Sequence, residues 1–323
     1  MLSDFKNNIL EVTGANAIFE LETIQTLWSG YGRIVRMGLE GAALNTIVVK
    51  HVSLPIESTH PRGWNTNLSH QRKLTSYKVE TNWYEQWSGK GTNACRMPQC
   101  YGVWTVGEEV CMVLEDLDAS GFPIRKTEVN PTDIENCLLW LANFHACYMM
   151  EHPKGLWETG TYWHLETRPE ELEAMEDDSL KKAAKKIDTL LKESPFQTFV
   201  HGDAKLANFC FSEGGTAVAA VDFQYVGGGC GMKDVAYFIG SCLYEHDCEA
   251  QEETLLAFYF KALKSALETQ NKTLDFTALE DNWRALFPVA WTDFHRFLKG
   301  WSPQHWKINS YSERLAKKVL TSL

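Results

Sequence analysis

The first third of the chain alternates between hydrophobic and polar residues with the period of two that is typical of β-strands. Residues 1–23 are predicted to form a short helix and a lead-in. The alternation over residues 24–49 then predicts three antiparallel strands, with a turn at Glu40-Gly41. A further hairpin is predicted to turn at residues 107–109. The predicted strands cover residues 25–28, 34–39, 44–49, 100–102 and 110–114.

The remainder of the chain has the longer period of helices, apart from one hairpin. Two short apolar runs, residues 209–211 and 217–221, flank Gly214-Gly215 and predict that hairpin. The glycines of residues 227–231 predict sharp backbone turns, and Asp234 is expected to cap the helix that follows them. The predicted helices cover residues 69–89, 133–150, 171–192, 235–243, 252–269, 276–298 and 311–320.

Composition narrows the class of protein. With 323 residues the chain is long enough for one large domain or two lobes, and its net charge of -11 argues against a broad nucleic-acid-binding surface. Its nine cysteines form no C-x-x-C pair, which favours reduced thiols in the cytoplasm over a disulfide frame or a zinc site. No run reaches the ~18 apolar residues of a membrane span, and the N-terminus lacks a signal-peptide pattern. We therefore expect neither a nucleic acid nor a membrane as partner.

The chemistry of the chain is concentrated on the predicted hairpin. Asp203 precedes its first strand, Asn208 follows five residues later, and the second strand leads into Asp222-Phe223. Phosphoryl transfer from ATP needs one carboxylate to orient the attacking hydroxyl and two oxygen ligands for Mg²⁺. By themselves, Asp203 and Asn208 are equally well explained as turn residues and Asp222 as the end of a strand. As an ordered set, they predict Asp203 as the catalytic base and Asn208 and Asp222 as metal ligands.

The segments HGDAKLANF and VDFQ resemble the choline kinase and aminoglycoside phosphotransferase group of small-molecule kinases. Within that group, the chain is most similar to the ecdysteroid-kinase-like branch, from about residue 24 onward. The resemblance implies an α+β, bilobal, protein-kinase-like fold with a β-rich nucleotide-binding lobe (residues 1–114), a hinge (residues 115–118) and a helical catalytic lobe (residues 119–323). It also implies that Lys205 neutralises the transferring phosphoryl group.

Four further predictions concern the nucleotide. In a kinase, Lys50 would hold the α- and β-phosphates, although a lysine at a strand end is most often a surface residue. Its carboxylate partner is predicted to be Glu80, with Glu85 as the rival. Gly30 and Gly32 would let backbone N–H groups approach phosphates, or simply form a hairpin turn. The hinge resemblance places adenine on the backbone of Glu115 and Leu117, where a charged surface turn is the alternative.

The acceptor is predicted to bind near the last helices, where this family builds its acceptor pocket. The four candidate residues can equally be packed core, and His145 in an earlier helix is expected to be structural. Residues 55–67, which are rich in His, Pro, Gly and Asn, are expected to form a mobile loop. The acceptor candidates are Trp291, Asp293, His295 and Trp301.

These features predict an ATP- and Mg²⁺-dependent kinase that phosphorylates a hydroxyl of a small metabolite or xenobiotic. A protein kinase fits less well, because no A-P-E segment follows Asp222. A nucleotide-binding regulatory protein without turnover is the alternative from another class. The sequence does not identify the acceptor or the oligomeric state.

Overall fold

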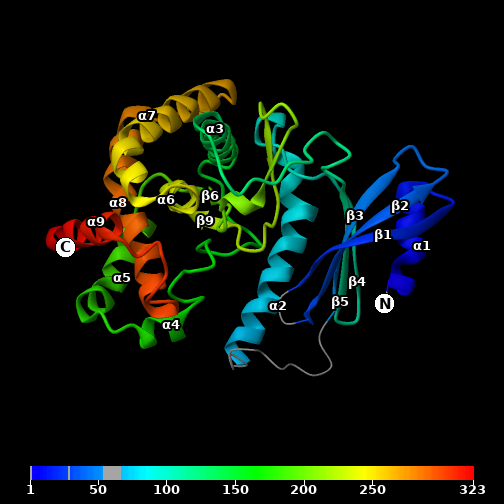
Figure 1. The fold of residues 1–323 in the computed structure, drawn as a ribbon, viewed down its shortest axis with the longest axis horizontal. Coiled ribbons are helices and arrows are strands. Elements are labelled where there is room, and N and C mark those ends of the chain that lie inside the picture. Colours follow the sequence, from blue (N-terminus) through cyan, green and yellow to red (C-terminus); the bar gives the residue numbers. More distant parts are fainter. Residues whose placement is uncertain (1, 28–29, 54–66) are drawn as a thin grey trace. The chain divides into compact units, whose positions relative to one another are not determined.

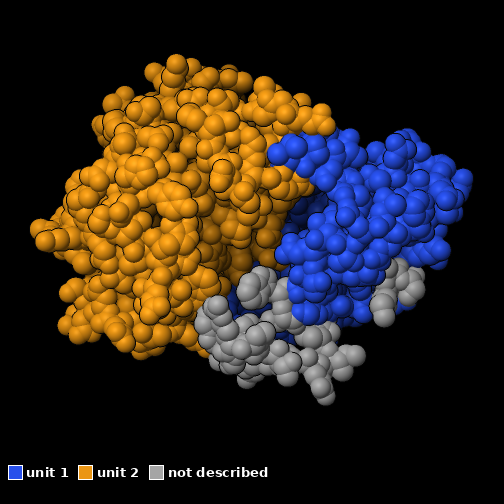
Figure 2. Space-filling model, in the orientation of Figure 1, with its two compact units in different colours: residues 1–90, 97–124 blue, residues 91–96, 125–323 orange. Residues whose placement is uncertain are grey.

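The computed structural model describes residues 2–27, 30–53 and 67–323 (Figure 1). These residues divide into two compact units, which Figure 2 colours separately. Unit 1 comprises Met1–Lys90 and Met97–Ile124, and unit 2 comprises Gly91–Arg96 and Arg125–Leu323. The predicted mobile loop at residues 55–67 lies almost entirely outside the described residues. The predicted hinge at residues 115–118 lies inside unit 1, and its role as a hinge stays a prediction.

Unit 1 is built around a five-stranded antiparallel sheet with the strand order β1-β2-β3-β5-β4. The turn between β1 and β2 is closed by hydrogen bonds from Leu27 N to Gly32 O (2.8 Å) and from Gly30 N to Leu27 O (3.1 Å). The strands are β1 (Ala17–Thr26), β2 (Gly32–Glu40), β3 (Thr46–Val52), β4 (Cys100–Val106) and β5 (Glu109–Glu115).

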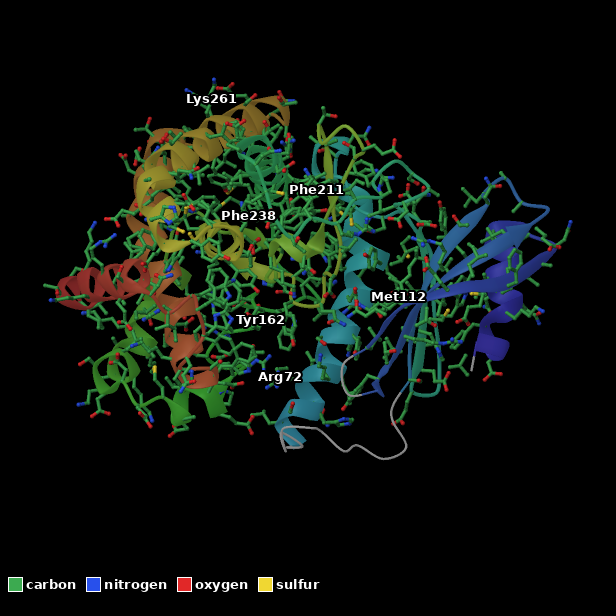
Figure 3. The ribbon with its side chains drawn as sticks, in the orientation of Figure 1. Arg72, Met112, Tyr162, Phe211, Phe238 and Lys261 are labelled. Atoms are coloured by element: carbon green, nitrogen blue, oxygen red, sulfur yellow. The ribbon has the colours of Figure 1, made fainter. Side chains whose placement is uncertain are left out.

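The N-terminal segment differs from its prediction. Strand β1 begins at Ala17, within the predicted lead-in. The sequence did not indicate this start, because most of this edge strand is exposed and its hydrophobic side chains do not form a buried face. Ile9 of helix α1 (Lys6–Thr13) and Phe5, directly before the helix, pack into a core with Val49 and its neighbours on the sheet. Met112 lies buried on β5, which pairs with β3 and β4 (Figure 3).

Helix α2 (Asn67–Asn82) continues into a π-helical turn, Trp83–Trp87, and together they cover most of the helix predicted for residues 69–89. Alternate residues of a strand point to opposite faces of a sheet. Val49 of β3 therefore lies in the core beside α1, whereas Lys50 points to the other face and contacts α2. The sequence had suggested that Lys50 ends its strand. In the structure, Lys50 lies inside β3, because pairing with β5 extends the strand to Val52.

Unit 2 is mainly helical. Figure 3 labels Phe211 at the end of β7 and Phe238 in α6, and both side chains are fully buried in this unit. Its helices are α3 (Pro131–Cys147), α4 (Pro169–Ala174), α5 (Asp178–Lys192), α6 (Met232–Cys242), α7 (Glu245–Thr269), α8 (Phe276–Trp301) and α9 (Ser310–Ser322). Its strands form two small antiparallel pairs, β6 (Thr198–Val200) with β9 (Gly227–Gly229) and β7 (Phe209–Phe211) with β8 (Val218–Ala220).

Two predictions in unit 2 are corrected by the structure. The charged helix predicted for residues 171–192 is two helices, because the Asp177 side chain accepts a hydrogen bond from Leu180 N and starts α5 afresh. Gly227–Gly229, expected to turn sharply, instead form strand β9. A Cβ atom at Gly227 would lie 2.2 Å from Trp157 O, so a neighbouring backbone requires the glycine there.

Candidate active site

Strand β6 ends directly before His201-Gly202-Asp203, so the sheet pairing with β9 fixes where this segment begins. Gly202 has a φ of 79°, and a Cβ atom there would lie 2.1 Å from Tyr225 O. The backbone N–H of Asp203 donates to His201 Nδ1 at 3.3 Å, and the other ring nitrogen of His201 lies 3.1 Å from Val221 O. The imidazole therefore carries its proton on Nε2 and joins the segment to the residue before Asp222.

Asp234 holds the same segment from the opposite side. Its two carboxylate oxygens accept hydrogen bonds from the backbone N–H groups of His201 (2.5 Å) and Gly202 (3.0 Å). His145, which is fully buried as expected of a structural histidine, donates to the same carboxylate at 3.2 Å. The prediction that Asp234 caps α6 is therefore wrong, because its carboxylate binds the segment before Asp203 and it lies within the helix.

Asp203 is the centre of the site in unit 2. Lys205 Nζ lies 2.8 Å from Asp203 Oδ2, and Asn208 Nδ2 donates both to that oxygen (3.0 Å) and to Asp203 O (2.8 Å). Tyr237 of α6 donates its hydroxyl to Asp203 Oδ1 at 3.1 Å. Three of the sequence-predicted residues are thus in direct contact, and Tyr237 is an addition that sequence reasoning missed.

Asp222 lies at the end of the same hairpin. Phe209 pairs with Ala220, and Val221 N donates to Asn208 O at 3.0 Å, so the hairpin aligns Asn208 with the segment that leads into Asp222. The φ of Asp222 is 70°, in the left-handed region that non-glycine residues seldom adopt. Such conformations concentrate at functional sites, where the surrounding structure enforces them.

The electrostatics of this group follow from burial and proximity. Burial, foremost, raises the pKa of Asp203, and the nearby negative charge of Asp222 raises it further, while Lys205 opposes both. For Lys205, burial acts to lower the pKa, but the attraction of Asp203 outweighs it and the pKa is raised. Lys205 is therefore protonated at neutral pH.

Tyr162 and Tyr237 extend the site into an aromatic cluster. The hydroxyl oxygens of Tyr237 and Tyr162 lie 3.3 Å apart, and Tyr162, which Figure 3 labels, is partly exposed. The rings of Phe294 and Phe297 of α8 contact Tyr162 edge-on, and Trp301 stacks on Phe297 at 5.6 Å. Of these aromatic residues, the sequence had singled out only Trp301, as a candidate for acceptor binding.

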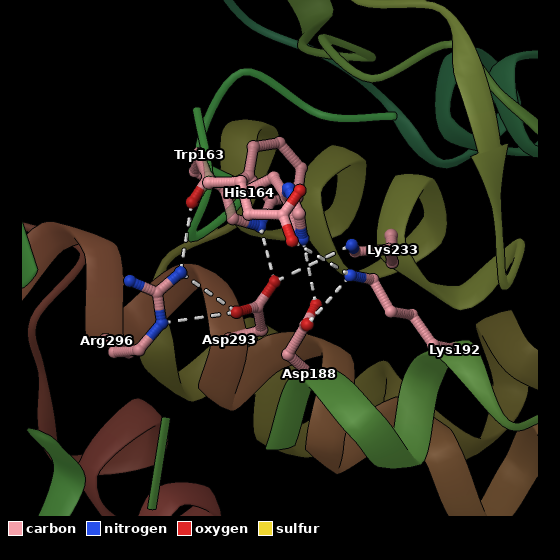
Figure 4. Close-up of polar contacts among 8 residues, drawn as sticks. Trp163, His164, Asp188, Lys192, Lys233, Asp293 and Arg296 are labelled. Atoms are coloured by element: carbon pink, nitrogen blue, oxygen red, sulfur yellow. Dashed lines mark hydrogen bonds and ion pairs between the residues drawn. The ribbon is translucent and has the colours of Figure 1, made fainter. Parts of the chain in front are cut away.

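A buried network of charges holds Trp163, the neighbour of Tyr162 (Figure 4). Asp293 Oδ2 accepts from Trp163 Nε1 at 3.0 Å, and its other oxygen pairs with Arg296. Arg296 also donates to Trp163 O at 3.0 Å, and Lys233 Nζ lies 3.8 Å from Asp293. Burial lowers the pKa of Lys233. The network holds the indole N–H and the backbone carbonyl of Trp163, and so positions the loop that carries Tyr162.

The four acceptor candidates fall in different surroundings. Trp291 is buried and packs edge-on against Tyr311 of α9 at 4.9 Å. His295 is also buried, 3.6 Å from Glu313 of α9, and burial lowers its pKa to about 4. Asp293 belongs to the charge network, whereas Trp301 adjoins the cluster that contains Tyr237. Their roles in acceptor binding stay predictions.

In unit 1, Lys50 Nζ lies 2.6 Å from Glu80 Oε2 and 2.9 Å from Oε1, and both side chains are buried. Of the two rivals, Glu80 is therefore the carboxylate that contacts Lys50. The φ of Gly32 is 123°, and a Cβ atom there would lie 2.0 Å from His51 O, so the turn requires glycine at this position. Whether these residues bind phosphates stays a prediction.

The residues predicted to hold adenine are tied into unit 1. Glu115 N donates to Gln99 O at 2.8 Å, and Leu117 O accepts from Phe122 N at 2.8 Å. Arg36 of β2 binds Asp116 at 2.8 Å and also contacts Asp118. This arginine fixes the segment after β5, and nothing in the hydrophobic pattern had indicated it.

The described residues also bear on a metal centre, a membrane span and disulfides. Within the part of the chain that the structure describes, no group of three or more His, Cys, Asp or Glu side chains is placed to hold a metal ion. Within that same part, no helix combines the length and the hydrophobicity that a bilayer crossing needs. Every cysteine is a thiol, as the scattered spacing predicted, and none forms a disulfide among the described residues.

Comparison with known proteins adds the following. A search of curated protein sequences gave no match. Among solved structures, an amicoumacin kinase in complex with AMP-PNP, Ca²⁺ and Ami is similar with a TM-score of 0.53 at 14% identity, covering 98% of this chain and 93% of that one. A microcompartment-associated aminopropanol kinase also has a TM-score of 0.53, at 12% identity, covering 99% of this chain and 93% of that one.

A Plasmodium vivax ethanolamine kinase has a TM-score of 0.50 at 12% identity, covering 94% of this chain and 82% of that one. At such identities the likeness establishes the fold. The predicted α+β fold with a β-rich N-terminal lobe and a larger helical C-terminal lobe is confirmed. The chain has the protein-kinase-like fold of these small-molecule kinases, and its residues 156–272 match the model of the ecdysteroid kinase-like family.

Proposed function

We propose that the protein is a small-molecule kinase that transfers the γ-phosphate of ATP to a hydroxyl of a small metabolite or xenobiotic. The observation that carries the proposal is the contact set of Asp203 with Lys205, Asn208 and Tyr237, beside Asp222. The family match over residues 156–272 includes all of these residues and supports the proposal. So do the names of the similar structures, which are kinases of small molecules.

In the proposed reaction, the acceptor oxygen attacks the γ-phosphorus while its O–H proton passes to Asp203. The new O–P bond forms as the bond from the γ-phosphorus to ADP breaks, so that the products are the phosphate ester and ADP. Tyr237 and Asn208 fix the carboxylate by hydrogen bonds, which holds it in one orientation for the hydroxyl. Lys205 supplies positive charge for the phosphoryl oxygens.

Asn208 and Asp222 suit Mg²⁺. The side-chain nitrogen of Asn208 donates hydrogen bonds to Asp203, so the side-chain oxygen of Asn208 is the atom that would bind a cation. Asp222 adds a carboxylate on a residue with a left-handed backbone conformation. Mg²⁺ commonly takes one or two carboxylates and completes its shell with phosphates and water. When bound, the ion would neutralise charge on the phosphates. In unit 1, we assign nucleotide binding to Lys50 with Glu80, to Gly30 and Gly32, and to the backbone of Glu115 and Leu117.

The test is an ATP-consumption assay with a panel of hydroxyl compounds and with a metabolite extract, in which phosphorylated products are identified by mass spectrometry. Formation of an ATP-dependent phosphate ester would support the proposal. Nucleotide binding without any product from the panel or the extract would instead favour a nucleotide-binding protein without turnover, and labelling of proteins alone would favour a protein kinase.

The pH profile of transfer should reflect the surroundings of Asp203. The base acts when ionised, so the rate rises with pH through its pKa, and burial places this rise above the ~3.9 of an ordinary aspartate. Lys205 lowers this pKa, so Lys205→Gln should move the acidic limb of kcat/KM to higher pH. A limb that stays in place or moves to lower pH in this variant would contradict the assignment of Asp203 as the base.

Asp222→Asn should weaken nucleotide affinity only when Mg²⁺ is present. Asparagine tolerates the left-handed conformation at this position, so the change removes charge with little effect on the backbone. Calorimetry with and without Mg²⁺ measures the effect, and without Mg²⁺ the affinity should be equal or tighter. Glu213→Gln removes a carboxylate from the exposed turn of the same hairpin and is the matched control. Equal Mg²⁺ dependence in both variants would rule out Asp222 as a ligand.

A further inference from the structure

Lys307 occupies an aromatic box in unit 2, in the segment between α8 and α9. Its Nζ lies 5.1 Å from the ring centre of Tyr237, 5.5 Å from that of Phe294 and 5.5 Å from that of Trp306. These distances are within the ~6 Å at which a cation is attracted to a ring face. Trp306 is the adjacent residue in the chain, but Tyr237 and Phe294 come from α6 and α8.

The box adjoins the candidate active site. Tyr237, which forms one wall, is the residue that donates its hydroxyl to Asp203. Tyr162 and Trp163 contact Tyr237 and Phe294, so the box belongs to the aromatic cluster described above. Within the described ranges, no carboxylate forms an ion pair with Lys307, and the charged group is instead surrounded by aromatic rings.

The charge of Lys307 is influenced by the same neighbours. Burial, chiefly, lowers the pKa of Lys307 to about 8, and the positive charge of Lys205 acts in the same direction. The charge of Asp203 opposes them. Asp203 and Lys205 are thus close enough to Lys307 for their charges to be felt there. At neutral pH the box holds a positive charge that belongs to the chain itself.

An aromatic box beside a catalytic carboxylate is the arrangement that would bind an ammonium group of a ligand. A second cation cannot share the box with Lys307, because like charges a few ångströms apart repel strongly in a partly buried site. We propose that Lys307 is a built-in cation that fills this box and restricts the acceptor to hydroxyl compounds without a positive charge. This inference rests on the proposed function, since it assigns the ligand as the acceptor.

The test compares two alcohols of nearly equal shape, choline and 3,3-dimethylbutan-1-ol, which differ in the positive charge. Binding of each to the full chain is measured by calorimetry or by ligand-observed NMR, so that no turnover is needed. The wild-type protein should bind the neutral alcohol more tightly. Lys307→Ala should shift the affinity ratio towards choline by about tenfold or more, because it vacates the box and removes the repulsion.

Two control variants separate charge from structure. Lys307→Arg keeps the charge and should keep the preference for the neutral alcohol, and Lys317→Ala, which removes an exposed lysine of α9, should behave like wild type. The proposal is overturned if wild type prefers choline, if a folded Lys307→Ala variant keeps the wild-type ratio, or if that variant binds neither alcohol. If Lys307→Ala shifts the affinity ratio but the protein phosphorylates no alcohol, the role of Lys307 in the box is supported and only the kinase proposal is refuted.

Discussion

Asp203→Asn is expected to lower the rate of phosphoryl transfer by about 10²- to 10⁴-fold, the usual cost of losing a general base. Asparagine keeps the size of the side chain and an oxygen that can accept from Tyr237, so the fold of the segment should persist. It cannot take up the acceptor proton. Nucleotide affinity should be nearly unchanged, because the base acts on the acceptor. Single-turnover kinetics measures the first effect, and calorimetry with nucleotide measures the second.

The control for this variant is Asp281→Asn, which makes the same chemical change at an exposed position of α8. The control should retain wild-type rates. If Asp203→Asn kept more than about a tenth of the activity, Asp203 would not be the base. If it lost nucleotide affinity in parallel with the rate, the residue would act mainly in binding.

Asp234→Ala is expected to lower the free energy of unfolding by about 2–6 kcal/mol, at ~1–3 kcal/mol for each of two buried backbone donors left without an acceptor. Those donors are the N–H groups of His201 and Gly202, and His145 loses the same partner. Denaturant unfolding measures the loss. Because the carboxylate also positions the segment that ends in Asp203, the rate of transfer should fall as well under conditions where the variant is folded.

Asp275→Ala provides the comparison. The Asp275 side chain also accepts a backbone hydrogen bond, from Ala278 N at the start of α8, but at an exposed position. Its loss should cost about 0.5–2 kcal/mol and leave the rate of transfer unchanged. A loss for Asp234→Ala no larger than that of Asp275→Ala would show that the contacts with His201 and Gly202 contribute little to stability.

Contacts that depend on nearby sequence were predictable. Asn208 and Asp222 are joined by a hairpin of about a dozen residues, and pairing within the hairpin aligns them however the rest of the chain packs. Lys50 follows a similar rule. Strand alternation directs Lys50 to the face of the sheet that Val49 does not occupy. The next helix in the sequence carries Glu80, which contacts Lys50 on that face. Short-range periodicity is sufficient in both cases because it fixes side-chain direction directly.

The neighbours of the side chains on α8 could not be predicted from nearby sequence. The four acceptor candidates lie within eleven residues and were predicted to surround one ligand, with the two tryptophans as walls and the other two as polar contacts, but a helix turns them to different sides. Trp291 and His295, four residues apart, both meet α9, while Asp293 joins the charge network. Trp301 lies with Phe297 near the Tyr237 cluster. Which side of α8 faces the candidate active site depends on the packing of α6 and α9, which the sequence of α8 does not contain.

By itself, the sequence determined the order of helices and hairpins and the set formed by Asp203, Asn208 and Asp222, because these rest on periodicity or on neighbours in the chain. The fold class followed from the resemblance of its motifs to those of small-molecule kinases. Only the tertiary structure decided that Asp234 binds the segment before Asp203, that Tyr237 donates to Asp203, and that Lys307 fills an aromatic box beside them. These contacts join residues 33, 34 and 70 positions apart. They exist because packing of the helices brings separate elements together, and no local pattern encodes which polar atoms will then meet.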